Sequence, residues 1–99
     1  MNIKFNAVND NILVKEKDAD IKINGIVQFN DDDSPYMFCE VLEVSPEIVL
    51  DIKKGDILVI RRYGKEEFIG GIYFVSYKDV RCIIEQEEFN KLCDIGLDI

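Results

Sequence analysis

Short apolar runs separated by turn residues recur along the chain, and this feature most limits the folds that it can adopt. Each run holds four to seven residues, mostly Val, Ile, Leu, Phe and Tyr. The runs cover residues 11–15, 38–44, 57–60, 72–77 and 80–84. Branched and aromatic side chains in runs of this length are typical of β-strands. Five to seven short strands with almost no helix predict an all-β fold, a small barrel or sandwich.

The length of 99 residues allows one hydrophobic core, and no linker or internal repeat divides the chain. We expect residues 1–85 to form the barrel and residues 86–99 to form a C-terminal extension. With 20 acidic and 12 basic residues, the chain carries a formal charge of −8. Such a charge repels phosphate backbones and anionic lipids, so neither nucleic acid nor a membrane is the expected partner.

The C-terminal extension shows the one helical pattern of the sequence. Phe89, Leu92 and Cys93 have the spacing of one helix face, and Gly96 follows them. This pattern predicts either a short helix that ends at Gly96 or a frayed tail.

The cysteines and the N-terminus indicate a cytoplasmic protein. No window approaches the roughly 18 consecutive apolar residues of a membrane span, and the N-terminus lacks the apolar region of a secretory signal. The three cysteines, Cys39, Cys82 and Cys93, are widely spaced and odd in number, which is typical of reduced thiols. Cys39 and Cys82 lie in predicted strands, where we expect them to behave as small buried hydrophobic residues.

Candidate catalytic and metal-binding residues are few. The chain has no histidine that could activate a cysteine, and a zinc site would need all three cysteines and a carboxylate. The run Asp31–Asp33 lacks the alternate spacing, the glycine and the distal glutamate of a calcium-binding loop. We therefore expect no enzyme activity, no metal and no cofactor.

The segment from about residue 16 to residue 36 is the anomaly of the sequence. It is acidic at both ends but holds a small apolar island of Ile21, Ile23, Gly25–Val27 and Phe29. A long mobile loop is one interpretation, in which the island is a recognition segment that orders on a partner. One further strand of the barrel is the other.

The order of these features resembles the ten-kilodalton co-chaperonins, the GroES-like ring-shaped lids of the large double-ring chaperonins. The resemblance covers most of residues 1–85, and it departs from the family in three places. Gln28 stands where the family usually has a third aliphatic residue, residues 45–51 are too few for the family's roof hairpin, and residues 86–99 extend past the usual end. The matching segments are Met1–Lys4, Asn9–Lys15, Gly25–Val27, Glu40–Val44, Lys54–Val59, Tyr63–Lys65 and Ile83–Glu85.

The resemblance implies a function as a lid that assists protein folding. Seven copies would form a ring that encloses non-native client proteins on a chaperonin, which itself binds ATP or ADP. The chaperonin-binding residues would be Gly25, Ile26, Val27, Gln28 and Phe29, with Phe29 compensating for Gln28. The subunit interface would pair an N-terminal strand with the last strand of a neighbour, through Ile3, Lys4, Phe5, Val80, Cys82 and Ile84. The missing roof is similar to that of phage-encoded members, which would act in the host cytoplasm.

Two other classes of protein remain open. A structural ring or hub protein, such as a virion component, would share the barrel and the oligomer but not the capture by a chaperonin. A barrel that binds oligonucleotides needs a basic groove with stacking aromatic residues. Tyr63, Tyr73 and Tyr77 could stack, but the charge of −8 opposes nucleic-acid binding.

Overall fold

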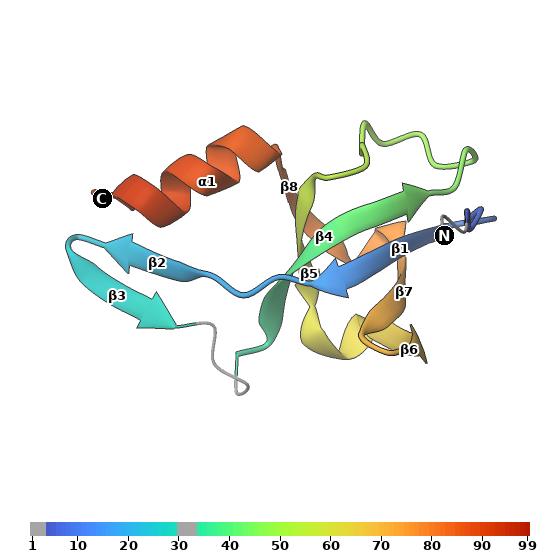
Figure 1. The fold of residues 1–99 in the computed structure, drawn as a ribbon, viewed down its shortest axis with the longest axis horizontal. Helices are drawn as coiled ribbons and strands as arrows, with labels where there is room; N and C mark the ends of the chain where they lie inside the picture. The colour runs from blue at the N-terminus through green and yellow to red at the C-terminus, as the bar shows by residue number, and fades with distance from the viewer. Residues whose placement is uncertain (1–3, 30–33) are drawn as a thin grey trace.

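The computed structural model describes residues 4–29 and 34–99, which form two antiparallel β-sheets and one α-helix (Figure 1). Six strands make the main sheet, in the order β6-β7-β1-β4-β5-β8, and β2 pairs with β3 in a separate sheet. The strands are β1 (Asn11–Glu16), β2 (Asp20–Ile23), β3 (Ile26–Phe29), β4 (Tyr36–Val44), β5 (Ile57–Arg61), β6 (Lys65–Ile69), β7 (Ile72–Ser76) and β8 (Val80–Ile84). The 3₁₀ turns η1 (Arg62–Gly64) and η2 (Tyr77–Asp79) precede β6 and β8, and α1 (Gln86–Ile95) follows β8.

The all-β class that the sequence predicts is confirmed. Every ladder of the main sheet is antiparallel, and the strands expected at 11–15, 38–44, 57–60, 72–77 and 80–84 appear as β1, β4, β5, β7 and β8. Among the described residues, the edge strands β6 and β8 do not pair with each other, so the structure does not show a closed barrel.

One face of the main sheet holds the core. The alternation of side chains along the strands places Ile12 and Val14 of β1 on this face, together with Cys39 and Val41 of β4. All four side chains are buried, and Leu58, Ile60 and Val75 join the same cluster from the neighbouring strands.

Two other segments cover parts of the opposite face. Phe89 of α1 is 1% exposed and packs edge-on against Phe38 of β4, with ring centroids 5.3 Å apart. At the other end of the sheet, Phe5 lies 5.7 Å from Phe68, which in turn lies 4.9 Å from Phe74. The helix and the N-terminal segment thus cover separate parts of this face.

Three expectations from the sequence need correction or refinement. The apolar runs of the sequence did not include residues 65–69, which form the strand β6 after η1. Its alternation was hidden because the strand is an edge with mostly exposed side chains. Cys82 is exposed, not buried, because β8 is also an edge strand. In place of an irregular loop or one more strand of the main sheet, residues 20–29 form a hairpin of their own.

The segment between β4 and β5 contains no strand, and all of it lies within the described residues. Ile52 is buried and Ile48 packs on the core, so the segment closes over one end of the sheet. The turn before β5 has Gly55 at φ +92°, and the Asp56 carboxylate accepts a hydrogen bond from the Lys53 amide at 2.9 Å. A roof hairpin is therefore absent between these strands.

No helix among the described residues combines the length and the apolar character that crossing a membrane requires.

Candidate functional site

The hairpin of β2 and β3 extends away from the main sheet, beside α1 (Figure 1). Its two-residue turn is Asn24–Gly25, with φ values of +52° and +81°. Positive φ at both central residues is the mark of a type I′ turn, which matches the twist of a hairpin and favours Asn followed by Gly. The same dipeptide between apolar residues is a local sequence signal that predicts this hairpin.

The predicted chaperonin-binding residues lie at the turn and along β3. Gly25 has open space around its Cα, and the Ile26 side chain is 66% exposed. The side chains of residues 27–29 lie outside the described part of the structure, as do Asp31–Asp33. In the register of the hairpin, position 27 pairs with Lys22 and position 29 with Asp20, whose side chains are exposed. The structure therefore places an exposed aliphatic residue at a glycine turn.

The hairpin is joined to the main sheet at its base. Where the chain leaves the sheet, the Lys17 amide donates to the Phe38 carbonyl at 3.0 Å. Where it returns, the Arg62 side chain donates from Nε to the Ser34 carbonyl at 2.7 Å. The Arg62 amide also donates to the Pro35 carbonyl at 2.8 Å. These contacts fix both ends of the segment but leave the turn far from the sheet.

Beyond its base, the hairpin rests on the C-terminal part of the chain. Figure 1 shows β2 beside α1, at the end of the molecule away from the N-terminus. Ile21 of β2 is 9% exposed, and Leu97 forms a parallel bridge with Ile23. No periodic pattern of the sequence indicates a role for Leu97, because a single bridge leaves no such pattern.

The predicted subunit interface involves two segments that the fold keeps apart. β8 is an edge of the main sheet, with Cys82 exposed and Val80 and Ile84 partly buried. Lys4 is exposed, and Phe5 packs against Phe68 of β6, the opposite edge; Ile3 lies outside the described residues. Among the described residues of one copy, no strand pairing joins the two segments, so the predicted pairing is one between copies.

The thiols differ in chemistry as well as in place. Burial, reinforced by the negative charge of Glu16, raises the pKa of the Cys39 thiol to about 12. At neutral pH this thiol is protonated and a poor nucleophile. Burial also raises the pKa of Cys93 on α1. Neither thiol has the lowered pKa of a catalytic cysteine.

A charged cluster lies beside Cys39 where β1, β6 and β7 meet. The ammonium of Lys65 lies 3.6 Å from the Glu16 carboxylate and 4.5 Å from the centroid of the Tyr73 ring. Burial and the neighbouring Glu16 raise the pKa of Tyr73. The Lys65 ammonium thus forms an ion pair with Glu16 and a cation–π contact with Tyr73, and these interactions are consistent with a structural role.

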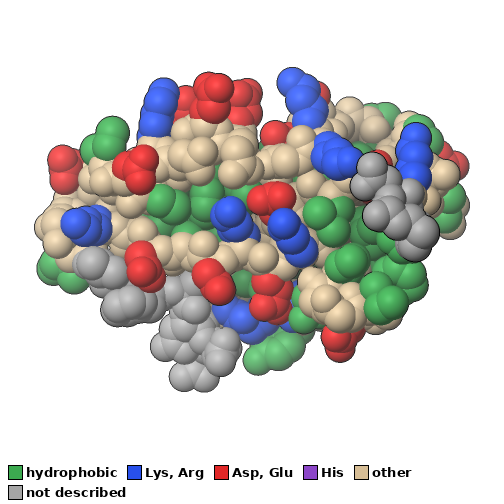
Figure 2. Space-filling model, in the orientation of Figure 1, with side chains coloured by type: hydrophobic (Ala, Val, Ile, Leu, Met, Phe, Trp, Pro, Cys, Tyr) green, Lys and Arg blue, Asp and Glu red, His purple; other side chains and the backbone are tan. Residues whose placement is uncertain are grey.

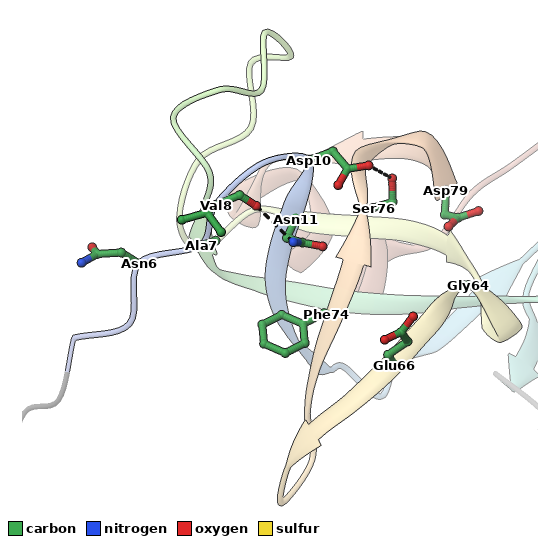
Figure 3. A pocket seen from close by; sticks show the side chains of 10 residues that line it. All are labelled: Asn6, Ala7, Val8, Asp10, Asn11, Gly64, Glu66, Phe74, Ser76 and Asp79. Atoms are coloured by element: carbon green, nitrogen blue, oxygen red, sulfur yellow. Dashed lines mark hydrogen bonds between the residues drawn. The ribbon is translucent and has the colours of Figure 1, made fainter.

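An acidic hollow lies between the N-terminal segment and β6, β7 and η2 (Figure 3). Its volume is about 540 Å³, and the carboxylates of Asp10, Glu66 and Asp79 line it. Asp10 accepts a hydrogen bond from the Ser76 hydroxyl at 2.9 Å, which ties the start of β1 to the end of β7. Among the described residues, no group of three or more His, Cys, Asp or Glu side chains could hold a metal ion.

Charges of both signs are interspersed on the face of the molecule that Figure 2 shows, with no continuous basic stripe. On the same face, hydrophobic side chains gather over β6 and β7, where Phe68 is 42% and Ile69 56% exposed. A groove for a phosphate backbone would need clustered Lys and Arg side chains. This face therefore suits contacts with protein better than contacts with nucleic acid.

No protein-family model matches the chain, and no curated protein matches its sequence.

Proposed function

We propose that the protein is a co-chaperonin, a ring-shaped lid that binds a large double-ring chaperonin while the chaperonin holds nucleotide, and so assists protein folding. The observation that carries the proposal is the projecting β2–β3 hairpin, which exposes Ile26 beside Gly25 at its turn. Contact of an aliphatic side chain with water is unfavourable, and the free energy falls when a partner covers the side chain. The resemblance supplies the identity of that partner.

The energy of one hairpin contact fits a lid that binds and releases. Burying one Ile or Val side chain contributes about 1.5–3 kcal/mol. One hairpin with two or three such residues would bind weakly once the loss of rotational and translational freedom is included. Several hairpins on one ring raise the effective concentration of each later contact, so the ring binds tightly while each contact stays reversible.

The two edges of the main sheet support assembly into a ring. β6 and β8 lie at opposite ends of the strand order, and each leaves one row of backbone groups without a strand partner among the described residues. A head-to-tail contact between such unlike edges repeats from copy to copy and closes when the rotation allows it. In the proposal, the N-terminal segment around Ile3–Phe5 pairs with β8 of the next copy, which covers an aggregation-prone edge. The resemblance further suggests a ring of seven copies. It also suggests a phage origin, with action in the host cytoplasm.

The net charge of −8 fits the enclosed chamber. A charged, hydrophilic inner surface does not retain an unfolded client, whose exposed groups are mainly apolar. The client would therefore not be held on the inner surface of the lid while it folds.

Two measurements test the proposal. The first is co-elution with a double-ring chaperonin, with and without ATP, and the second is the native mass of the free protein. We expect a ring mass and ATP-dependent co-elution. Ile26→Ser should abolish co-elution without changing the ring mass, and Phe29→Ser should do the same if Phe29 compensates for Gln28. Val49→Ser is the matched control, because Val49 is 95% exposed but lies far along the chain from the hairpin. A ring that does not co-elute with the chaperonin, either with or without ATP, would refute the proposal and favour a structural ring or hub protein.

A further inference from the structure

The last four residues, 96–99, lie along the free edge of β2, and we call them the C-terminal strap. The Leu97 amide donates to the Lys22 carbonyl at 2.8 Å, and the Asn24 amide donates to the Leu97 carbonyl at 2.8 Å. The Ile99 amide donates to Oδ1 of Asn24 at 2.9 Å. The strap therefore contacts the strand and the turn of the hairpin, and β2 has a partner on both sides.

Gly96 makes this arrangement possible. The residue ends α1 with φ +83°, and its amide donates to the Leu92 carbonyl at 3.0 Å. A Cβ atom at this position would lie 2.4 Å from the Lys22 carbonyl oxygen, closer than atoms can pack. Only glycine combines the left-handed backbone with this close approach. Glycine at position 96 thus allows the chain to turn from α1 into the strap and to approach β2 closely.

The strap is anchored to the main sheet through α1. Phe89 of α1 is 1% exposed and packs on Phe38 of β4, while β2 contacts the same helix. Because the helix is fixed to the sheet, the strap holds the hairpin in one position relative to the sheet. The main-sheet strands themselves make only sparse contacts with the described part of the hairpin.

We propose that the C-terminal strap is a conformational device that keeps the β2–β3 hairpin folded in the free protein and thereby sets its affinity for a partner. A two-stranded hairpin is at best marginally stable in water, and a third segment with helix packing stabilises it. The strap does not cover the turn, since Ile26 remains 66% exposed and nothing lies within 4 Å of a Cβ built on Gly25. It orders the binding segment without masking it.

The consequence for binding rests on the proposed function. A segment that folds only on its partner loses conformational entropy at that moment, and its affinity falls accordingly. A strapped hairpin has already lost that entropy. Weakening the strap should therefore lower the affinity for a chaperonin, even though no residue of the strap is required to touch it.

Gly96→Ala tests the device, with Gly71→Ala as the matched control. Gly71 has the same φ of +83°, but a Cβ there would meet nothing within 4 Å. In the free protein, we expect Gly96→Ala to speed amide hydrogen exchange in β2 and β3 at least tenfold while β1 and β4 exchange as in the wild type. Gly71→Ala should leave the exchange of β2 and β3 unchanged. Equal exchange of the hairpin in wild type and Gly96→Ala would overturn the proposal.

A second variant avoids any strain at the helix end. A chain that stops after Gly96 keeps α1 but loses the hydrogen bonds of Leu97 and Ile99, and it should show the same fast exchange in the hairpin. Unchanged protection in this variant would likewise overturn the proposal. Chaperonin binding is measured separately: both variants should bind at least tenfold more weakly than the wild type, and tighter binding would mean that the strap masks the turn. If the wild type binds no chaperonin, the proposed function fails while the exchange result still decides the role of the strap.

Discussion

The main sheet and the β2–β3 hairpin are stabilised in different ways. In the sheet, strands far apart in sequence bury branched side chains against one another, and Ile12, Val14 and Ile60 are all 0% exposed. In the hairpin, Ile21 is the one residue with a buried side chain among those described at positions 20–26. The hairpin is otherwise stabilised by its turn, by its contact with α1 and by a few hydrogen bonds from the strap.

This difference suits two tasks. A cooperative core opens only when the whole domain unfolds, whereas a segment with little buried apolar area opens locally at low cost. A ring subunit needs a rigid body, and a contact that binds and releases needs a segment that responds to its surroundings. We expect the two regions to open with clearly different free energies.

Leu58→Ala should have the largest effect and should separate the two regions. Leu58 is 0% exposed in the core, so its truncation should lower the free energy of unfolding by about 2–5 kcal/mol. Denaturant unfolding measures this loss, and Val49→Ala serves as the exposed control, with a change below about 0.5 kcal/mol. The amides of β2 and β3 should exchange no faster than in the wild type, because they exchange by local opening. A parallel acceleration in hairpin and core would show that both regions open together.

The Cys39 thiol makes the stability of the main sheet depend on alkaline pH. Its pKa in the folded protein is about 12, above the ordinary value of 9.0, so unfolding at pH values between these two releases a proton. The contribution to stability is complete below pH 9 and is lost as the pH rises toward 12, by about 1.4 kcal/mol per pH unit.

Denaturant midpoints between pH 8 and pH 11 measure this slope. Other groups also titrate there, so Cys39→Ala is the reference, and the wild type should fall more steeply with pH than this variant. Cys82→Ala is the control for the loss of a cysteine from the exposed edge strand β8. Identical slopes for the wild type and Cys39→Ala would show that this thiol ionises alike in the folded and unfolded chains.

The same contrast explains what the sequence could predict. The strands of the main sheet are visible because burial forces branched residues such as Ile12 and Val14 into a regular pattern. The edge strand β6 has little burial and so little pattern. The hairpin could have been predicted from Asn24–Gly25, a local signal. The strap could not, because its contact with β2 joins residues more than 70 positions apart, as in the hydrogen bond between Ile99 and Asn24.

Asn24→Gly should have the smallest effect and should isolate one contact of the strap. Glycine accepts the φ of +52° at this position, so the turn is kept while Oδ1, the acceptor for the Ile99 amide, is lost. One hydrogen bond contributes about 0.5–1.5 kcal/mol, so hairpin amides should exchange up to about tenfold faster. Asn9→Gly is the matched control, because Asn9 has a φ of +61° but lies outside the hairpin. If both variants exchange like the wild type in β2 and β3, the bond from Ile99 adds nothing to the hairpin, and the strap would have to act through Leu97 alone.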